Sequence, residues 1–360
     1  MIILSNKILT VARNINKPLV KFLVVKGWYL RLAKKKIKNG KFKRLNSTEK
    51  REIKQYWKKY GKKVSFQWCS YLSYGNGIVD KRYIPESLYY GEILHKISYV
   101  PMGHGLSDKN LYSMLFNAKQ PRTIIRKANN IFLNENYEYI SLEDAVNLCT
   151  KEEEIIIKPT NETYGGSGIS FWNKEDGTEK LKDILNDYQD VICQEIVKQH
   201  PFFDSIHSKS LNTLRIVTLM IDDEPVHLST VLRMGRNNSK VDNFSAGGLI
   251  CAVDKEGYLY EKAVQGDQRI IDRHPDGFIF KGKQVPFYDR IIESAKQMHY
   301  RIPYFKLVSW DYSLSPEGEP ILIEGNYPWG QIDLHQLNIG PIFGEYTDRV
   351  LDYVYKGKAL

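Results

Sequence analysis

Apolar positions change their spacing along the chain, and this change separates a helical first part from a mixed second part. Up to about residue 120 they recur every three or four positions. This spacing predicts an amphipathic helix after Pro18, another over 47–60, and two more over 86–97 and 107–117. The first third of the chain is therefore expected to be mainly helical.

From about residue 121, short continuous apolar runs alternate with helical periods. The runs EIIIKPT at 154–160 and VICQEIV at 191–197 have the length and flanks of strands buried on both faces. An antiparallel series of strands is expected between residues 211 and 264. Further strands are predicted within 122–133, and further helices over 141–149, 178–188, 286–302 and 342–355.

The stretch SWDYSLSPEGEPILIEGN at 309–326 reads as two short strands around a Pro-Glu-Gly-Glu turn. Glu324 and Asn326 would share one face because strand side chains alternate, and Asp311 is expected opposite them. Two carboxylates buried together need a cation, and oxygen ligands of this kind suit hard divalent ions. Taken alone, the stretch is equally compatible with a solvated hairpin edge that carries incidental acids.

The composition, with 42% hydrophobic and 26% charged residues, is that of a soluble globular protein. The four cysteines are far apart, which argues against a disulfide framework and indicates a reducing compartment. No stretch resembles a signal peptide, and no apolar run approaches the roughly 18 residues of a membrane-spanning helix. We therefore expect a cytoplasmic protein.

The net charge of +10 is unevenly distributed. Residues 1–63 hold 20 basic residues and two acidic ones, whereas the remainder is slightly acidic. A basic amphipathic helix with Trp28 and Tyr29 predicts contact of residues 1–45 with an anionic membrane surface. The alternative is a helix that packs its apolar face on the body and solvates its lysines. No nucleic-acid-binding motif accompanies the charge, so no nucleic acid partner is expected.

A glycine-rich segment follows the strand predicted at 154–160. Lys158 stands at the end of that strand, and Gly165, Gly166 and Gly168 follow in a loop. Glycines let backbone N–H groups close around phosphate oxygens, and a lysine adds positive charge. The spacing matches neither the P-loop nor the dinucleotide fingerprint, so the segment becomes informative only together with the acidic hairpin downstream.

In this order, the lysine, the glycine loop and the Asp…Glu-x-Asn hairpin resemble the ATP-grasp superfamily. More narrowly, roughly residues 45–355 are similar to the sugar-transfer-associated ATP-grasp proteins of bacterial surface-polysaccharide biosynthesis. The stretches that carry this likeness are YIPESLYYGEI, SDKNLYSMLF, SLNTLRIVTL, VDNFSAGG and LVSWDYSLSPEGEPILIEGNYPWGQIDLHQ. The resemblance implies an α+β ATP-grasp fold, in which two α+β subdomains clasp ATP, preceded by a helical basic N-terminal region.

The resemblance also divides the chain and assigns roles to matching positions. The parts would be a basic helical extension (1–63), a lead-in (64–120), a small subdomain with the glycine loop (121–200) and a large subdomain with the metal hairpin and acceptor site (201–360). Lys109 and Lys158 would hold ATP, and Asp311, Glu324 and Asn326 would bind two Mg²⁺ ions. The other residues expected to contact ATP are Gly165, Gly166, Ser167 and Gly168 over the phosphates and Gln194, Glu195 and Val197 in the hinge beside adenine.

One position departs from the family pattern. Ligases of the D-alanine–D-alanine type have an arginine two residues before the hairpin aspartate, where this chain has Ser309. Other cations would have to meet the transition-state charge, and the candidates are Arg215, Arg233 and Arg236, with a structural ion pair as the alternative for Arg215. The acceptor pocket is expected to contain Asn243, Ser245, Gly247, Gly248 and His335, although a tight turn and a structural histidine would account for the same residues.

The implied activity is that of an ATP- and Mg²⁺-dependent carboxylate–amine ligase. It would activate a carboxylate as an acyl phosphate and join an amino acid or amine to a uronic-acid sugar, small or lipid-linked, in capsule or other surface-polysaccharide biosynthesis. A peripheral position on the inner face of the bacterial membrane would suit that role. Two alternatives stay open: an ATP-dependent phosphotransferase acting on a sugar, and a non-catalytic docking protein for glycosyltransferases.

Overall fold

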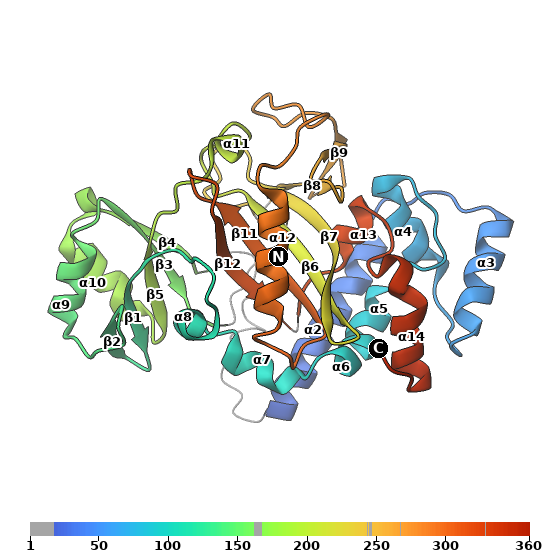
Figure 1. Ribbon diagram of the computed structural model, residues 1–360, viewed down its shortest axis with the longest axis horizontal. Helices are drawn as coiled ribbons and strands as arrows, with labels where there is room; N and C mark the ends of the chain where they lie inside the picture. Colours follow the sequence, from blue (N-terminus) through green and yellow to red (C-terminus); the bar gives the residue numbers. More distant parts are fainter. Residues whose placement is uncertain (1–17, 162–167, 243, 245–246, 267, 328) are drawn as a thin grey trace.

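The computed structural model describes residues 18–161, 168–242, 244, 247–266, 268–327 and 329–360. A helical N-terminal part, a small five-stranded sheet and a large seven-stranded sheet make up the described molecule. The large sheet lies in the middle, with the small sheet on one side and most of the N-terminal helices on the other (Figure 1). This mixture of helices and antiparallel sheets confirms the expected α+β class.

The N-terminal part is helical, as the apolar spacing predicts. Asn46 caps α3 by accepting a hydrogen bond from the Glu49 amide, within a capping box. The predicted helix over 86–97 is one continuous run with a π-helical middle. The bounds are α2 (Pro18–Asn39), α3 (Ser47–Lys58), α4 (Phe66–Asn76), α5 (Glu86–Leu88), η1 (Tyr89–Ile93), α6 (Leu94–Ile97) and α7 (Val100–Leu106).

The capped helix predicted over 107–117 is present over a shorter range and begins as a 3₁₀ turn. α7 ends at Leu106, and the chain restarts as the 3₁₀ turn η2 (Lys109–Leu111) and the short helix α8 (Tyr112–Leu115). Asp108 caps this restart, because its side chain accepts a hydrogen bond from the Asn110 amide at 2.9 Å. Lys109 therefore stands at the first position of a tight turn.

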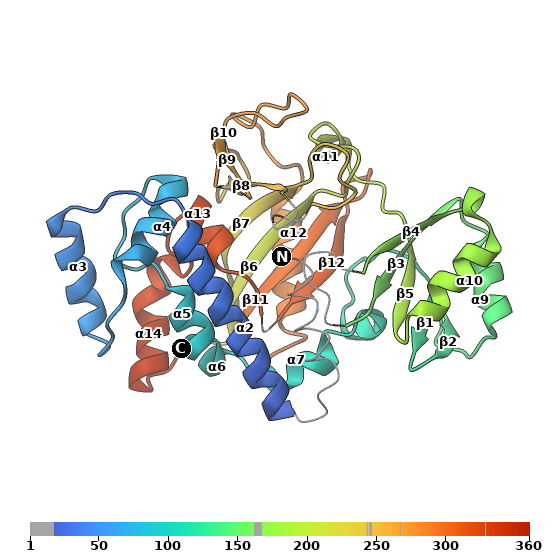
Figure 2. The ribbon, with the colours of Figure 1, turned by 180° about the vertical axis from the view of Figure 1, so that it is seen from behind.

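The small sheet has the strand order β2-β1-β5-β3-β4, and all its strands pair antiparallel. Helices α9 and α10 cover the face turned away from the large sheet (Figures 1 and 2). Their apolar sides pack on the strands around the fully buried Trp172 and Leu181. The bounds are β1 (Thr123–Ala128), β2 (Ile131–Asn134), α9 (Leu142–Cys149), β3 (Glu154–Pro159), β4 (Ser170–Asn173), η3 (Lys174–Asp176), α10 (Thr178–Asp187) and β5 (Val191–Glu195).

The large sheet has the strand order β10-β9-β8-β7-β6-β11-β12. Helix α12 packs on one face through Leu214 and Ile216 of β6, whereas Val231 of β7, which is paired with Arg215, packs with Leu334 of α13 on the other face. The bounds are α11 (Pro201–Asp204), β6 (Thr213–Ile221), β7 (Glu224–Met234), β8 (Leu249–Val253), β9 (Leu259–Gln265), β10 (Ile270–Ile271), α12 (Tyr288–His299), β11 (Leu307–Leu314), β12 (Pro320–Asn326), α13 (Asp333–Asn338), η5 (Gly344–Tyr346) and α14 (Thr347–Lys356).

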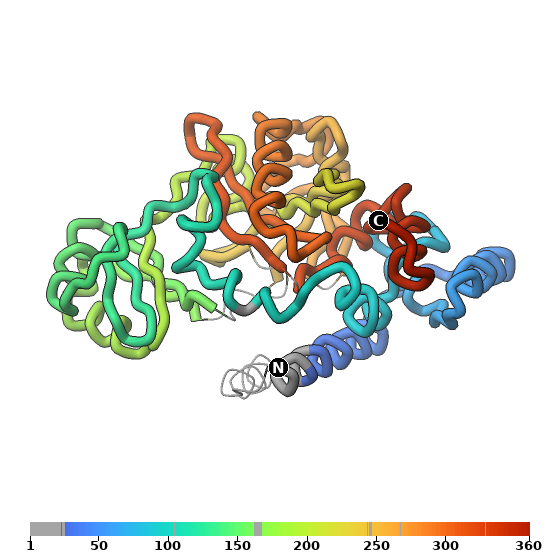
Figure 3. The backbone as a smooth tube through the Cα atoms, turned by 60° about the horizontal axis from the view of Figure 1, so that its bottom comes forward, coloured from blue at the N-terminus to red at the C-terminus, as the bar shows by residue number. Residues whose placement is uncertain are grey.

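Helix α2 packs on the body along its apolar side. It contacts α5 and η1, and it runs along one edge of the molecule in Figure 3. Tyr29 is 4% exposed and stacks on both Tyr90 and Trp329, with ring centroids 4.3 and 5.0 Å away. The aromatic ring expected at a membrane interface is thus part of the protein core, and this face of α2 follows the alternative of packing on the body.

A buried charge also attaches α2 to the body. Lys36 Nζ lies 2.8 Å from Glu86 Oε1 and 2.5 Å from Asp333 Oδ2, and both carboxylates are almost fully buried. Burial and the nearby Asp333 raise the pKa of Glu86 to about 8, although Lys36 opposes this shift. Among the described residues, no helix has both the length and the apolar character needed to cross a membrane.

Candidate nucleotide and metal site

The predicted metal hairpin is formed by β11 and β12. Asp311 lies directly opposite Glu324, and Ser309 lies opposite Asn326. Directly opposed residues of an antiparallel pair project to the same face. Asp311 is 3% exposed, whereas Glu324 and Asn326 are half-buried. The structure therefore brings the three predicted metal ligands together on one face of the large sheet.

Two arginines from neighbouring strands hold Asp311. Arg215 lies opposite it on β6 and donates from Nε and Nη2 to Oδ1 and Oδ2 at 2.8 and 2.7 Å. Arg233 on β7 donates from Nη1 to Oδ2 at 2.9 Å. Burial alone would raise the pKa of Asp311, but the two guanidinium groups outweigh it and lower the pKa to about 2. The cation missing at Ser309 is thus matched by cations on adjacent strands.

A second carboxylate extends this chain of charges. Arg233 Nη2 donates to Asp242 Oδ1 at 3.2 Å, and the Thr213 hydroxyl donates to the other oxygen. Burial raises the pKa of Asp242, although Arg233 opposes the shift. Asp242 is not among the residues expected from the sequence, although it belongs to the VDNFSAGG stretch. It ties the segment between β7 and β8 to the metal hairpin.

That segment also carries most residues expected in the acceptor pocket. Asn243 and Ser245 lie outside the described residues. Gly247 has a φ of 96°, which favours glycine, and a Cβ added there would lie 2.8 Å from Arg236 Nη2. Gly248 is buried just before β8. Arg236 therefore packs on this segment, whereas the other two candidate cations contact Asp311.

The two candidate ATP lysines come from outside the large sheet. Lys109 Nζ forms an ion pair with Glu324 Oε1 at 2.9 Å. Lys158, on β3, donates to Gln194 Oε1 at 3.1 Å. Burial, together with the nearby charge of Lys109, lowers the pKa of Lys158 to about 8, while Glu324 opposes this shift. Positive charge is therefore concentrated beside the metal hairpin, where phosphate oxygens would be attracted.

The glycine loop is described only at its end. Gly165, Gly166 and Ser167 lie outside the described residues. Gly168 has a φ of 79°, and a Cβ added there would lie 2.9 Å from Pro159 Cγ. The chain thus returns directly against the end of β3, next to Lys158.

Lys109 is positioned by the small sheet rather than by the helices before it. Its amide donates to Thr160 O at 3.1 Å. The next residue, Asn110, is buried. Its Nδ2 donates to Lys127 O at 3.1 Å, and its backbone carbonyl oxygen accepts from Arg126 Nε at 3.3 Å. The lysine that reaches Glu324 on the large sheet is therefore attached at its base to β1 and to the end of β3.

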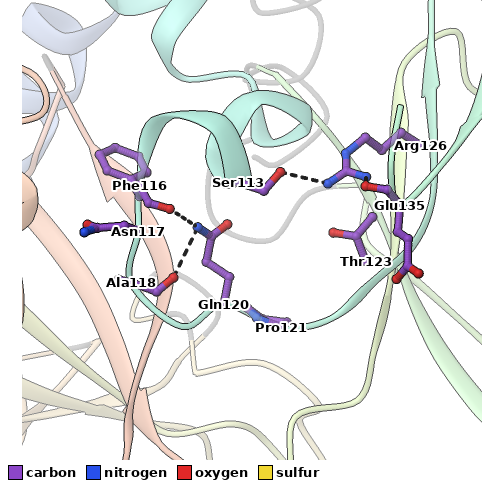
Figure 4. Close-up of a pocket in the computed structure, with 9 residues that line it drawn as sticks. All are labelled: Ser113, Phe116, Asn117, Ala118, Gln120, Pro121, Thr123, Arg126 and Glu135. Carbon is purple, nitrogen blue, oxygen red and sulfur yellow. Dashed lines mark hydrogen bonds between the residues drawn. The ribbon is translucent and has the colours of Figure 1, made fainter. Parts of the chain in front are cut away.

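A pocket of about 300 Å³ lies beside this attachment. In Figure 4, Arg126 reaches Ser113, and Gln120 turns toward the carbonyl groups of Phe116 and Ala118. Its lining contains none of the described residues expected to contact nucleotide or metal. We therefore do not assign it to the nucleotide.

The predicted hinge connects the small sheet to the large one. Gln194 Nε2 donates to Pro121 O at 3.2 Å. Glu195 accepts from the Arg122 amide at 3.0 Å and from Arg122 Nε at 3.3 Å. Val197 is half-buried and lies outside the strands. The side chain of Glu195 is thus occupied by Arg122. The backbone N–H and C=O groups of the hinge are therefore the remaining candidates for contact with adenine.

His335 lies under the site rather than open to solvent. It is fully buried on α13, and its Nδ1 is 2.7 Å from the Ser229 hydroxyl. Burial, followed by the charge of Arg215, lowers the pKa of His335 to about 3, so the ring is neutral. Its Nε2 has no hydrogen-bond partner among the described residues. A role in substrate contact stays a prediction.

The donor set fits a divalent cation beside a phosphate chain. Asp311 and Glu324 offer carboxylate oxygens and Asn326 an amide oxygen, which are ligands that Mg²⁺ prefers. Among the described contacts, Asp311 Oδ1 accepts one hydrogen bond, from Arg215, so it retains a lone pair. Lys109 and Lys158 supply the positive charge that phosphate oxygens need.

The chain is similar to several solved structures at low sequence identity. One is the biotin carboxylase domain of 2-oxoglutarate carboxylase from Hydrogenobacter thermophilus (TM-score 0.44, 11% identity, 71% of this chain and 46% of that one). Others are an L-amino acid ligase from Bacillus licheniformis (0.39, 13%, 71% and 49%) and D-alanyl-alanine synthetase A from Vibrio cholerae (0.42, 11%, 73% and 66%). The chain spans about half the length of the first two. No match was found among curated proteins.

A model of the sugar-transfer associated ATP-grasp family matches residues 104–341. The match covers about two thirds of the chain. It includes both candidate lysines, the small sheet, the large sheet with its metal hairpin, and α13. The chain belongs to the sugar-transfer associated ATP-grasp family.

Proposed function

We propose that the protein is an ATP- and Mg²⁺-dependent carboxylate–amine ligase that joins an amine or amino acid to a sugar acid of a bacterial surface polysaccharide. The observation that carries the proposal is the meeting of two lysines with the Asp311, Glu324 and Asn326 group. Lys109 spans from the small sheet to Glu324, and the half-buried Lys158 lies near both. The family description supports the link to sugar transfer, as do the ligases among proteins of similar fold.

The chemistry would proceed in two steps. A carboxylate oxygen of the sugar acid attacks the γ-phosphorus of ATP, so that ADP leaves and an acyl phosphate forms. The amine then attacks the acyl carbon, which forms the amide and releases phosphate and one proton. Mg²⁺, when bound, would neutralise charge on the phosphate oxygens.

The residues of this chain have distinct parts in that scheme. Lys109 and Lys158 would bind phosphate oxygens through their ammonium groups. Asp311 is kept ionised by Arg215 and Arg233, so it offers negative charge to a cation at neutral pH. The same guanidinium groups lie next to the hairpin, where they would offset negative charge that develops during phosphoryl transfer.

The first test is nucleotide binding by thermal shift. Wild-type protein with ATP and Mg²⁺ is expected to melt at a higher temperature, because a ligand of the native state stabilises it. Glu324→Ala is expected to lose this Mg²⁺-dependent rise. Glu319→Ala is the matched control, since Glu319 lies in the turn of the same hairpin, is 59% exposed and pairs with Lys119. If folded wild-type protein shows no rise in melting temperature and no ATP binding in equilibrium dialysis, the alternative of a non-catalytic docking protein is favoured.

The second test is product identity. Purified protein is incubated with Mg²⁺-ATP and a panel of uronic acids and amines, and ADP release and product mass are measured. An amide has the summed mass of its two substrates less one water, whereas a phosphorylated sugar gains a phosphate. If a phosphorylated sugar is the only product, the proposed ligase activity is wrong and the protein is a phosphotransferase. Nucleotide binding without turnover would call for a wider panel of lipid-linked acids.

We also propose that the N-terminal region places the enzyme on the inner face of the membrane. Arg31, Lys34, Lys35 and Lys38 are exposed on α2, away from the buried Tyr29. Anionic lipid attracts such residues by about 1 kcal/mol each. Full-length protein is expected to sediment with phosphatidylglycerol vesicles at low salt and to be released by high salt. Unchanged sedimentation after Lys34, Lys35 and Lys38 are replaced by Gln would contradict this.

A further inference from the structure

Two histidines and an aspartate form a group outside the nucleotide site. His207 follows α11, and His274 and Asp276 follow β10. Each residue offers one ligand atom, and the three atoms lie within 4.8 Å of one another. Both imidazole side chains are 0% exposed, whereas the Asp276 side chain is 44% exposed. The group is thus buried in the protein on the histidine side and open to solvent on the aspartate side.

Hydrogen bonds define which nitrogen of His274 carries its proton. Nδ1 accepts from the Asp276 amide at 3.1 Å, so Nε2 is the protonated nitrogen and donates to Gly235 O at 2.8 Å. His207 has the same orientation, with Nε2 3.4 Å from Ser239 O. Both rings therefore direct Nε2 to carbonyl groups of one segment and Nδ1 to one carboxylate. Metal-binding histidines usually donate their second N–H in this way.

His207 and Asp276 are joined by a short polar contact. Nδ1 of His207 is 2.6 Å from Asp276 Oδ2. A hydrogen on Nδ1 of His207 would make this contact a hydrogen bond, and a metal ion held by the same two atoms would replace that hydrogen. A proton would satisfy this one pair of atoms. A metal ion would also engage His274 Nδ1, which lies 3.9 Å from the same oxygen.

The 3.9 Å between His274 Nδ1 and Asp276 Oδ2 is the spacing of two ligands of one ion, whereas the 2.6 Å between His207 Nδ1 and the same oxygen would have to lengthen by about 0.5 Å or more for an ion to bind. Two ligands that are each about 2.0–2.2 Å from a shared zinc ion lie about 3–4 Å apart. Nitrogen from imidazole and one carboxylate oxygen are typical ligands of zinc-class ions, which often bind three side chains and a water molecule. The oxygen-only hairpin of Asp311 and Glu324 has a different preference, for hard ions such as Mg²⁺.

We propose that His207, His274 and Asp276 bind one transition-metal ion of the zinc class, with water in the remaining position. The ion would take the Nδ1 lone pair of His274 from the Asp276 amide. Through Gly235 and Ser239 it would anchor residues 235–242, which end at Asp242 and so at its contact with Arg233. Its role would be structural, and this inference does not depend on the reaction proposed for the nucleotide site.

The test is direct metal binding. Tag-free protein, stripped with a chelator, is titrated with Zn²⁺ against a chromophoric competitor and, separately, with Co²⁺ while visible absorption is recorded. Wild-type protein is expected to bind about one Zn²⁺ per chain and to show a cobalt band. His207→Asn and Asp276→Asn are expected to weaken binding by about tenfold or more.

A matched control is available on the neighbouring segment. His200→Asn removes an imidazole outside the group and keeps a side chain that can accept from the Phe202 amide, as His200 does now. Its zinc affinity is expected to equal that of wild type. Absence of zinc binding and of a cobalt band in folded wild-type protein would overturn the proposal and leave a protonated His207 as the bridge. Equal weak binding by wild type and all variants would overturn it as well.

Discussion

The two sheets differ in how they hold the charges of the proposed nucleotide site. On the large sheet the charges are already paired, because Arg215 and Arg233 both contact Asp311 and Arg233 also contacts Asp242. On the small sheet Lys158 is half-buried next to a neutral amide, and its pKa is lowered to about 8. One half is electrostatically balanced without ligand, and the other carries a desolvated charge.

This difference indicates what nucleotide would do to each half. A phosphate placed beside Lys158 would compensate a charge that burial disfavours, so the small sheet would gain most from binding. The large sheet would change less, since its charges are held by fixed strand register. The balanced half therefore determines where the metal and phosphate can lie, and the unbalanced half responds to their arrival.

The largest effect on stability is expected from the loss of Asp311, the carboxylate that both arginines of the large sheet contact. Asp311→Asn leaves two buried guanidinium groups without their carboxylate, and losing one partner of a buried pair typically costs about 3–5 kcal/mol. We expect a loss of this size in the free energy of unfolding, measured by urea titration. Asp222→Asn is the control, because the Asp222–Arg349 pair is on the surface and its loss should change stability little. Equal effects of the two substitutions would refute the distinction.

Removing the unbalanced charge is expected to act in the opposite direction. Lys158→Met keeps the aliphatic length and eliminates the cost of burying an ammonium group. With a pKa of about 8 in the folded protein against 10.5 as the ordinary value, that cost is up to about 3 kcal/mol. The variant is therefore expected to be more stable at pH 7, although it should lose ATP affinity.

The pH dependence sharpens this prediction. Below pH 8 Lys158 is protonated in both the folded and the unfolded chain, so the full cost is present. Between pH 8 and about 10.5 the folded lysine loses its proton first, so wild-type stability rises relative to the variant. The urea midpoints of wild type and Lys158→Met should therefore approach each other as the pH rises from 6.5 to 10.5. A difference in stability that is constant with pH would mean that the effect comes from packing instead. The control is Lys182→Met on α10, where the lysine is 36% exposed and pairs with Glu179, and this variant should show no such trend.

The smallest effect is expected from a change in the turn that carries Lys109, which links the small sheet to Glu324 of the large sheet. Asn110→Ala removes the hydrogen bond to Lys127 O that holds the turn bearing Lys109, at a cost to stability of about 1 kcal/mol. Since Lys109 would then be less well oriented, ATP affinity is expected to fall about tenfold, which corresponds to about 1.4 kcal/mol. Calorimetric titration with ATP and Mg²⁺ measures this. The exposed Asn136→Ala should leave affinity unchanged, and a loss of stability without loss of affinity would show that Asn110 does not position Lys109.

Features governed by local rules were predictable from the sequence. The alternation of side chains and the Pro-Glu-Gly-Glu turn predict that Asp311 faces the strand of Glu324, and the register agrees. Strands with continuous apolar runs, such as β3 and β5, were predicted for the same reason. In these cases the residues that decide the structure are neighbours in the chain or lie on one hairpin.

Features that depend on distant partners were not predictable. Asp242 gains its role only because β6, β7 and β11 align two arginines next to it. The burial of Tyr29 depends on Trp329, 300 residues away. His207 and Asp276 look like isolated polar residues until the chain returns after β10. The helix predicted over 107–117 is shorter and begins as a 3₁₀ turn at Lys109, because a short helix with a 3₁₀ turn has the same local spacing as one longer helix.

The ion pair between Lys109 and Glu324 would make ATP binding at the proposed site an exchange reaction. Without nucleotide, the lysine of one half already satisfies the carboxylate of the other, so the protein carries its own stand-in for the missing metal and phosphate. Incoming Mg²⁺ and phosphate would have to displace each partner from the other. Every measured affinity then reports a difference between two bound states, and as the products leave, the lysine and the glutamate would rejoin and oppose rebinding of ADP.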